Sequence, residues 1–319
     1  MQRRHLIAAT AATVFAPHAA RAQDLPKKIT LFVGFAAGGA ADHAARVVAK
    51  RLADNLGATV VVENKAGAGG NIVHQQVSQA APDGSVILLG SIGPLSISPH
   101  LGKLGYDPQK DLAPLTMGMN FPNVLVVPPT LGAKSLAELI ALAKREPGKL
   151  NYGSTGAGSA SHLAGELFAD LAGIDIVHIP FKGGAPAVTE LLAGRLSMYF
   201  ATMSTAQQHI AAGKLVPLAT TGLTRAPFLP DLPTVAERLP GFTATNWYAF
   251  VAPGKTPAPI LDKWNQELVK ALKSPEVADE LTRAGLLPAP GTRDELAKYI
   301  ASESATWGKV VRDRKITAG

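Results

Sequence analysis

Short apolar runs alternate with longer segments of helical periodicity along the first third of the chain. Residues 29–35 form an apolar run rich in Ile, Leu, Phe and Val, which predicts a buried strand. Residues 41–56 place apolar side chains every three or four positions, which predicts a helix with one buried face. Further strands are predicted over 59–63 and 85–90, with a helix over 71–80 between them. This order of strand, loop, helix and strand is typical of an α/β layer fold.

The middle of the chain shows the same order without repeating the sequence. Apolar runs predict four strands there, over residues 149–153, 175–179, 197–201 and 215–221. Segments of helical spacing predict three helices there, over residues 159–171, 185–193 and 206–212. The tail adds predicted helices over 260–272 and 293–307, and Thr292 with Glu295 has the spacing of a capping box before the second of them.

Two long and mostly apolar stretches, residues 112–127 and 244–253, separate these blocks. Each is long enough to cross between two lobes, and together they would form a hinge. We therefore expect a first lobe built from both ends of the chain, residues 23–120 and 244–319, and a second lobe built from residues 121–243. Each lobe would be a sheet flanked by helices.

The N-terminus has the three regions of a cleavable secretory signal peptide over residues 1–22. Arg3 and Arg4 give a basic start, residues 6–16 are apolar, and residues 20–22 read Ala-Arg-Ala, a cleavage signal of the A-x-A type. The apolar part is too short to span a bilayer. The paired arginines also permit export by the twin-arginine route instead of the general secretory route. We expect the mature protein to reside in the periplasm.

Composition narrows the classes of function. The chain has no cysteine, which excludes disulfides and thiol chemistry. Removing Arg3, Arg4 and Arg21 with the signal peptide leaves 28 basic and 24 acidic residues, a net charge near +4. This mild positive field favours small anions, but no basic run carries interleaved aromatic residues, so we expect no nucleic-acid partner. No mature segment reaches about 18 uninterrupted apolar residues, and we expect a soluble monomer.

Three glycine-rich loops join a predicted strand to a predicted helix, over residues 35–42, 64–71 and 153–162. A helix N-terminus presents unpaired backbone N–H groups and the positive end of a dipole, so it is a ready anion site. Glycine lets the backbone approach a ligand closely, and loops at the carboxyl ends of strands line the ligand crevice of an open sheet. We therefore predict that these loops share one anionic ligand.

The predicted ligand contacts come from these loops and from the residue that follows the strand over 85–90. They are Phe35, Ala36, Ala37, Gly38, Gly39, Asp42, Gly69, Gly70, Ser91, Ser154, Thr155, Gly156, Ser159 and His162.

Several of the polar and aromatic residues are open to two interpretations. Asp42 could accept a hydrogen bond from an amine or hydroxyl of the ligand, or it could cap its own helix. Lys182 could meet an anion or be a solvated loop lysine. Trp247 and Tyr248 could stack on a ligand, although packing in the hinge or core is the more common role of such residues.

Nucleotide binding and catalysis are the main rival functions. The chain has no G-x-x-x-x-G-K-[ST] motif, and residues 153–158 (Gly-Ser-Thr-Gly-Ala-Gly) do not match G-x-G-x-x-G. No serine stands in a G-x-S-x-G elbow. His162 and Glu166 lie four residues apart on one predicted helix, but no cysteine or second histidine stands near them in the sequence to complete a metal site. We expect no catalytic residue, no metal and no cofactor.

The motifs also occur in an order that is characteristic of one family. They are residues 38–42 (Gly-Gly-Ala-Ala-Asp) with Arg46, 62–72, 82–84 (Pro-Asp-Gly), 106–108 (Tyr-Asp-Pro) with Asp111, 150–154, 158–159, 162–166, 178–186 (His-Ile-Pro-Phe-Lys-Gly-Gly-Ala-Pro), 232–237 and 252–257. With these stretches the chain resembles the Bug-type (TctC-like) solute receptors of the tripartite tricarboxylate transporter family. The resemblance covers essentially the whole mature chain. It departs at Ala37, where the family often has proline.

The resemblance implies a two-lobed α/β fold of the type II periplasmic-binding-protein class, which closes on its ligand like a flytrap. It implies a carboxylate held mainly by backbone amides and bridging waters from residues 35–42 and 154–159, with Asp42 facing the cleft. The family's ligands include di- and tricarboxylates, amino acids and aromatic acids. The implied partner is a membrane carrier with a large and a small subunit, driven by an ion gradient. Two alternatives remain beside transport: a sensor that presents its solute to a membrane histidine kinase, and an enzyme on the same scaffold.

Overall fold

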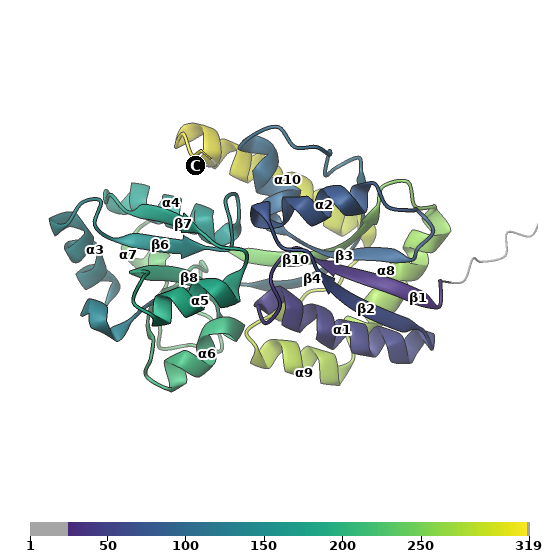
Figure 1. The fold of residues 1–319 in the computed structure, drawn as a ribbon, viewed down its shortest axis with the longest axis horizontal. Helices are drawn as coiled ribbons and strands as arrows, with labels where there is room; N and C mark the ends of the chain where they lie inside the picture. The colour runs from purple at the N-terminus through teal and green to yellow at the C-terminus, as the bar shows by residue number, and fades with distance from the viewer. Residues whose placement is uncertain (1–24, 318–319) are drawn as a thin grey trace, which may run out of the picture.

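The computed structural model describes residues 25–317 and shows two α/β lobes side by side, each with its own sheet (Figure 1). The predicted signal peptide over residues 1–22 lies outside the described residues. Within the described range, no helix has the length and apolar character needed to cross a membrane.

The first lobe contains a six-stranded mixed sheet in the order β11-β4-β10-β3-β1-β2. β1 is parallel to β2 and β3, whereas β10 is antiparallel to β3 and β4. The strands are β1 (Lys28–Val33), β2 (Thr59–Asn64), β3 (Val86–Ser91), β4 (Leu112–Phe121), β10 (Asn246–Pro253) and β11 (Leu287–Pro288). The sheet therefore joins segments from both ends of the chain.

The second lobe contains a five-stranded sheet in the order β7-β6-β8-β5-β9. β6 is parallel to β7 and β8, and β5 is antiparallel to both β8 and β9. The strands are β5 (Asn123–Val127), β6 (Asn151–Ser154), β7 (Val177–Pro180), β8 (Met198–Thr202) and β9 (Val216–Thr220). All of them come from the middle of the chain.

Helices cover both sheets (Figure 1). Those associated with the first lobe are α1 (Ala40–Leu56), α2 (Asn71–Ser78), α8 (Ala258–Leu272), α9 (Pro275–Arg283) and α10 (Arg293–Asp313). Those of the second lobe are α3 (Leu136–Arg145), α4 (Ala160–Ala172), α5 (Gly184–Leu192), α6 (Met203–Ala211) and α7 (Val235–Arg238). Short helical turns complete the described chain: η1 (Ala68–Gly70), η2 (Gly93–Ile97), η3 (Ser98–His100) and η4 (Pro129–Leu131).

The helix α10 reaches from the first lobe to the second. It begins at a capping box in which the Glu295 N–H donates to the Thr292 hydroxyl at 3.1 Å, as the sequence predicts. Just beyond its end, Arg314 forms an ion pair with Asp170 of α4 in the second lobe. The last helix therefore ties the lobes together along one side.

The long apolar stretch over residues 112–127 is two strands in different sheets. β4 ends at Phe121 and β5 begins at Asn123, so the chain changes lobes at Pro122. Proline has no N–H to donate to a sheet ladder, which explains why the strand breaks there. The return crossing leads into β10 at Asn246, and the Asn246 side-chain amide lies 3.5 Å from the Asn123 side-chain oxygen. The lobe boundaries expected from the sequence stay a prediction.

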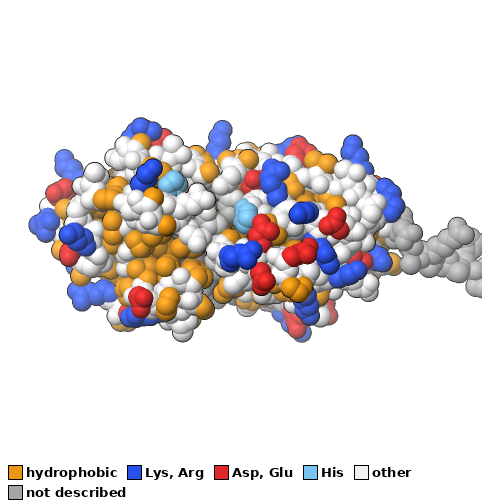
Figure 2. Space-filling view, turned by 90° about the horizontal axis from the view of Figure 1, so that it is seen from below, with side chains coloured by type: hydrophobic (Ala, Val, Ile, Leu, Met, Phe, Trp, Pro, Cys, Tyr) orange, Lys and Arg blue, Asp and Glu red, His pale blue; other side chains and the backbone are white. Residues whose placement is uncertain are grey.

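The two lobes present different surfaces on the side seen in Figure 2. Acidic and basic side chains are interspersed over the first lobe, whereas apolar side chains cover a broader area of the second. The charge on this face is therefore mixed in sign.

Candidate ligand-binding site

A small cavity of about 30 Å³ lies where the two lobes meet. The first lobe lines it with Phe35 after β1 and Ser91 at the end of β3, and the second lobe lines it with Thr155 after β6 and Thr202 at the end of β8. Such a volume accommodates only about two water molecules. The structure is therefore closed, and a larger ligand can enter only if the lobes separate.

Three helix N-termini border this cavity. Gly39 is the N-cap of α1 and has no capping side-chain bond, and Ala40 and Ala41 of its first turn line the cavity. Ala160 of α4 and Gly184 of α5 line it from the second lobe. The first N–H groups of a helix have no partner within the helix. The cavity thus collects backbone donors and the positive ends of three helix dipoles.

All of the described residues that line the cavity carry neutral side chains. Their polar groups are the hydroxyls and amides of Ser91, Asn123, Thr155, Ser159, Ser161, Tyr199, Thr202, Asn246 and Tyr248. Their larger apolar surfaces come from Phe35, Ile92 and Phe200, together with the two tyrosine rings. Neutral donors around a buried cavity suit an anion without leaving a buried cation unpaired when the ligand departs.

The predicted contacts divide into two groups. Those that line the cavity are Phe35, Gly39, Ser91, Thr155 and Ser159. Those that belong to adjoining loops and helices without lining it are Ala36, Ala37, Gly38, Asp42, Gly69, Gly70, Ser154, Gly156 and His162. That each of these residues contacts a ligand stays a prediction. In the second group, Asp42 and His162 hold the backbone of neighbouring loops in place.

Asp42 secures the loop that precedes α1. One carboxylate oxygen accepts the Gly38 N–H at 3.0 Å and the Arg46 Nε–H at 3.0 Å, and the other forms an ion pair with Arg46 at 2.9 Å. Burial favours a higher pKa for the Asp42 carboxyl, but hydrogen bonds from Arg46, Gly38 and Asn64 outweigh it and hold the pKa below its usual value. Asp42 is therefore a carboxylate that fixes the loop backbone.

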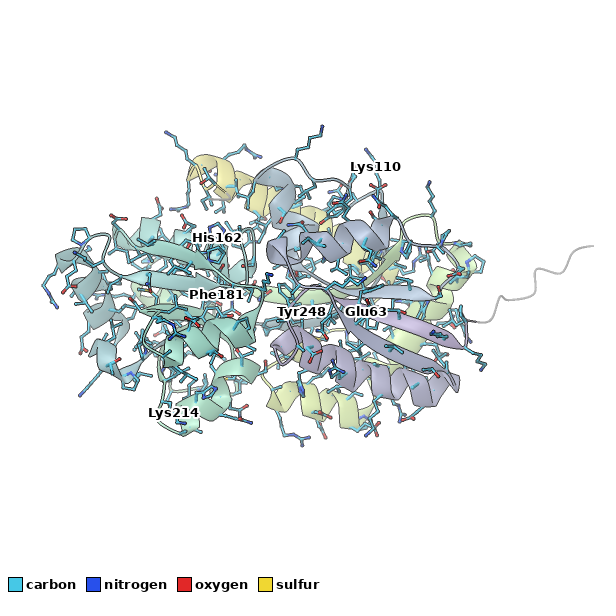
Figure 3. All side chains as sticks on the ribbon, viewed as in Figure 1. Glu63, Lys110, His162, Phe181, Lys214 and Tyr248 are labelled. Carbon is cyan, nitrogen blue, oxygen red and sulfur yellow. The ribbon has the colours of Figure 1, made fainter. Side chains whose placement is uncertain are left out.

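His162 secures the corresponding loop of the second lobe. Its Nδ1 accepts the Gly158 N–H at 3.2 Å, so its other ring nitrogen carries the proton and faces Glu166 at 3.8 Å. The His162 ring stacks on that of His178, with 4.1 Å between the centroids, and His178 Nε2 lies 2.6 Å from the Ser154 hydroxyl. These contacts hold His162 within the second lobe, where Figure 3 labels it, and His162 does not line the cavity.

Burial keeps both stacked histidines neutral. It lowers the pKa of His162 to about 4, and burial together with the proximity of His162 lowers that of His178 to about 4. A neutral imidazole is required at His162, because a protonated Nδ1 could not accept the Gly158 N–H. Within the described residues, no group of three or more His, Asp or Glu side chains is placed to hold a metal ion.

Glycines form the seam along which the lobes touch. A Cβ atom at Gly69 of the first lobe would lie 2.4 Å from the Ala157 carbonyl oxygen of the second. A Cβ atom at Gly93 would lie 2.7 Å from the Gly158 carbonyl oxygen in the same way. The loop over residues 64–71 therefore meets the opposite lobe through its backbone. Glycine permits this close approach because it has no side chain.

Several residues that line the cavity were not among the contacts predicted from the sequence. Asn123 and Asn246 stand at the two lobe crossings, Tyr199 lies in β8, and Gly184 begins α5. The sequence favours packing over ligand stacking for Tyr248, but this residue lines the cavity, and Figure 3 labels it at the junction of the lobes. Trp247, its neighbour, is fully buried and donates its ring N–H to Glu303 at 3.1 Å. The Lys182 side chain is exposed, and its backbone carbonyl accepts the Ala36 N–H of the first lobe at 2.9 Å.

Comparison with known proteins identifies the class to which this fold and site belong. The family model described as the tripartite tricarboxylate transporter family receptor matches residues 44–316. The chain is 38% identical to the protein BugT of Bordetella pertussis over 290 residues, which cover 90% of this chain and 89% of that protein. The chain therefore belongs to the family of tripartite tricarboxylate transporter receptors, which are periplasmic solute-binding proteins.

Solved structures agree with this assignment. The structure titled R. palustris Rpa4515 with adipate has 33% identity and a TM-score of 0.88, covering 91% of this chain and 98% of its own. The structure of the periplasmic binding protein BugD has 33% identity and a TM-score of 0.88, with coverages of 92% and 99%. MatC of Rhodopseudomonas palustris with bound malate has 31% identity and a TM-score of 0.85, with coverages of 89% and 98%. The fold is the two-lobed type II periplasmic-binding-protein fold that the resemblance implies.

Proposed function

We propose that this protein is an exported receptor that holds the carboxylate of a small organic acid in the cavity between its lobes. It then delivers the acid to a membrane carrier with one large and one small subunit, which an ion gradient drives. The observation that carries this proposal is the convergence of three helix N-termini, those of α1, α4 and α5, on one cavity with a neutral lining.

The physical basis of recognition is charge-assisted hydrogen bonding. Backbone N–H groups in the first turns of α1 and α4 would donate to the carboxylate directly or through water. Each such bond to a charged group contributes about 1.5–3 kcal/mol net. The helix dipoles add favourable electrostatics without a buried cation. The lobes exclude water when they close, which strengthens each of these interactions.

The ligand class rests on the site and on the relatives together. Two similar proteins have adipate and malate in the titles of their structures, and both ligands are small dicarboxylic acids. The neutral and partly aromatic lining of this cavity would suit a small acid of that kind, an amino acid or an aromatic acid. We therefore place the ligand among small carboxylates.

Closure would signal the bound state to the carrier. The Ala36 N–H of the first lobe donates to the Lys182 carbonyl of the second at 2.9 Å, and this bond can form only while the lobes are closed. A ligand shifts the balance between open and closed forms only by its differential affinity for the closed form. A carboxylate held by donors of both lobes has that differential affinity, because the open form offers it fewer donors.

The remaining parts of the proposal concern the location and state of the protein. The signal peptide over residues 1–22 would direct export and be removed, which mass spectrometry of the periplasmic protein can test. The mature chain would act as a monomer and release its ligand chemically unchanged. Recovery of an altered compound after incubation with the purified protein would instead indicate an enzyme.

The binding claim is tested on the mature protein with a panel of mono-, di- and tricarboxylates, amino acids and aromatic acids. We expect at least one carboxylate to raise the melting temperature and to bind with a stoichiometry of one by calorimetry. We expect Gly39→Val to abolish this binding in a folded protein, because the added methyl groups would fill the entrance to α1. Gly39→Ala is the matched control, since a Cβ there meets the Ala36 carbonyl oxygen only at 3.5 Å. Retained affinity in Gly39→Val would refute the assignment of this loop.

A further inference from the structure

Two glycines of the loop after β6 meet the first lobe through their backbones. A Cβ atom at Gly156 would lie 2.7 Å from the nearest atom of the first lobe, and a Cβ atom at Gly158 would lie 2.9 Å from another. The Gly156 N–H donates to the Ser154 hydroxyl at 3.1 Å, and the Gly158 N–H donates to His162 Nδ1 at 3.2 Å. Each of these contacts with the first lobe therefore depends on one acceptor inside the second.

Ser154 is in turn held by a second histidine. Its side chain is fully buried, and its Oγ lies 2.6 Å from His178 Nε2. The ring of His178 stacks on that of His162 with 4.1 Å between the centroids, and on that of Tyr152 with 5.0 Å. Both glycine N–H groups thus lead to one stacked pair of imidazoles, directly in one case and through Ser154 in the other.

The existing hydrogen bonds determine where His162 would take up a proton. Because Nδ1 accepts the Gly158 N–H, the proton of the neutral ring is on Nε2, which lies 3.8 Å from a carboxylate oxygen of Glu166. A further proton must therefore go to Nδ1. There it would place a donor opposite the Gly158 N–H, and the hydrogen bond that fixes the loop would be lost.

The groups around the pair act in both directions on its protonation. The titratable groups of the described chain that face it are Glu166 of α4 and Tyr152 of β6, whose hydroxyl donates to the Glu166 carboxylate at 2.5 Å. Burial lowers the pKa of both histidines to about 4, and for His178 the neighbouring His162 adds to this effect while Glu166 opposes it. The loop is therefore held while the pair is neutral.

From this geometry we infer that His162 and His178 form a proton-sensitive restraint on residues 154–159, so that uptake of a proton by the pair frees this loop, weakens closure and releases the ligand. Each histidine is a positioning residue, His162 through its own bond to the loop and His178 through Ser154. The effect on a ligand rests on the proposed function, because two residues of this loop line the cavity.

The direction of the pH effect follows from linkage. The closed form with neutral histidines binds fewer protons than a form in which the loop is free, so acid favours the open form. A histidine whose pKa rises from about 4 to an ordinary value near 6.5 on release weakens binding by at most about tenfold at pH 5.5. Near pH 7.5 both forms are unprotonated and the effect disappears.

The first test follows the loop itself, by nuclear magnetic resonance on the mature protein without ligand between pH 7.5 and pH 3.5. We expect the amide signal of Gly158 to move with the same midpoint as the ring signals of His162. In His162→Asn it should stay in place, because the asparagine oxygen accepts the same N–H without titrating. A Gly158 signal that stays in place while the ring titrates, or a ring that takes up no proton before the protein unfolds, would overturn the inference.

The second test measures affinity by calorimetry at pH 7.5 and pH 5.5, with adipate and malate as probes. The variant His162→Asn/His178→Gln has no titratable ring in the pair, and the titration of each acid is common to both proteins and cancels. We expect the parent protein to lose about three- to tenfold more affinity on acidification than this variant. The control His209→Gln, which changes a half-buried histidine of α6, should behave as the parent protein. Equal losses in the parent and the double variant would contradict the link to ligand release.

A double-mutant cycle at pH 7.5 tests the role of His178. Ser154→Ala removes the acceptor of the Gly156 N–H, and His178→Phe keeps a ring in the stack but cannot bond to Ser154. Each should weaken binding about three- to tenfold, and the double variant should lose no more than the weaker single variant, because both act through one bond. Additive losses, or unchanged affinity in His178→Phe, would refute this role.

The outcomes separate the inference from the proposed function. Failure of adipate, malate and every other carboxylate of the panel would overturn the proposed function, and the response of Gly158 to pH would still decide whether the pair restrains the loop. Binding that does not depend on the pair would overturn the inference and leave the proposed function standing.

Discussion

The backbone N–H of Ala36 donates to the backbone carbonyl of Lys182 at 2.9 Å, and this hydrogen bond joins the two lobes close in sequence to Phe35 and Gly184, which line the cavity. A Cβ atom at Gly183, the next residue, would lie 3.0 Å from the Ala36 nitrogen. The two backbones can approach so closely only because a glycine follows Lys182. The closed form thus depends on glycines in both lobes.

We expect Gly69→Ala to weaken ligand binding, because Gly69 lies where the backbones of the two lobes touch. The new methyl group would lie 2.4 Å from the Ala157 carbonyl oxygen, so the lobes could not close fully. We expect the affinity for the best carboxylate to fall at least tenfold, measured by calorimetry. Gly69 also has a φ of 63°, so the substitution costs about 1–2 kcal/mol of backbone strain.

Gly57→Ala separates these two effects. Gly57 has a φ of 53° and no atom within 4 Å of its Cβ position, so the variant carries the strain without the contact. It should lose a similar stability in urea and keep its affinity. Unchanged affinity in Gly69→Ala would contradict the role of the seam.

We expect the substitution Asp42→Asn to have a modest and indirect effect on ligand binding. Asp42→Asn keeps an oxygen for the Gly38 N–H but loses the ion pair with Arg46, which is itself half exposed. We expect affinity to fall several-fold and the free energy of unfolding to fall by about 0.2–1 kcal/mol. Arg46→Gln should reproduce both changes if Asp42 acts through the loop. A loss above a hundredfold in Asp42→Asn, without a matching loss in Arg46→Gln, would indicate direct ligand contact instead.

We expect the two stacked histidines, His162 and His178, to make the protein less stable in acid. The pKa values of His162 and His178 are lowered to about 4 in the folded protein by burial, against an ordinary value near 6.5. Between these values the unfolded chain binds more protons than the folded one, so the free energy of unfolding falls as pH decreases from about 6.5 to about 4. We expect the free energy of unfolding, measured by urea titration, to fall by on the order of 1–3 kcal/mol across this pH range.

His162→Asn isolates one histidine within this pH dependence. The asparagine oxygen can accept the Gly158 N–H in place of Nδ1 and does not titrate. The variant should show a smaller dependence of unfolding free energy on pH than the parent protein, with affinity retained near pH 7. An identical slope in both proteins would mean that His162 does not contribute.

Much of the fold follows from the local pattern of residues. The alternation of apolar runs and helical segments predicts strands such as β1 and helices such as α1 to within about two residues, because each has its own buried face. The helix α3 was missed although Ser135 caps it and accepts the Glu138 N–H at 3.2 Å. Residues 112–127 were expected to cross between the lobes, but an apolar run alone does not indicate that two separate strands meet at Pro122.

The site was less accessible to sequence reasoning than the fold. Loops such as the one before α1 are indicated in the sequence by glycines at a strand-to-helix junction, and Gly39 of that loop lines the cavity. Asn123, Tyr199 and Asn246 carry no such local signal, because they meet only when the strands of two sheets are placed side by side. The structural role of His162 depends likewise on a hydrogen bond to Gly158 that spacing alone does not indicate.

A crystal structure of the mature protein with the tightest carboxylate from the panel tests the central claim most directly. We expect one carboxylate of the ligand to lie between the lobes, with its oxygens within about 2.7–3.2 Å of backbone N–H groups of Ala40 or Ala41 and of Ala160 or Ser161, or linked to them by a single water. A carboxylate bound by a lysine or arginine side chain, or bound outside the cavity between the lobes, would contradict it.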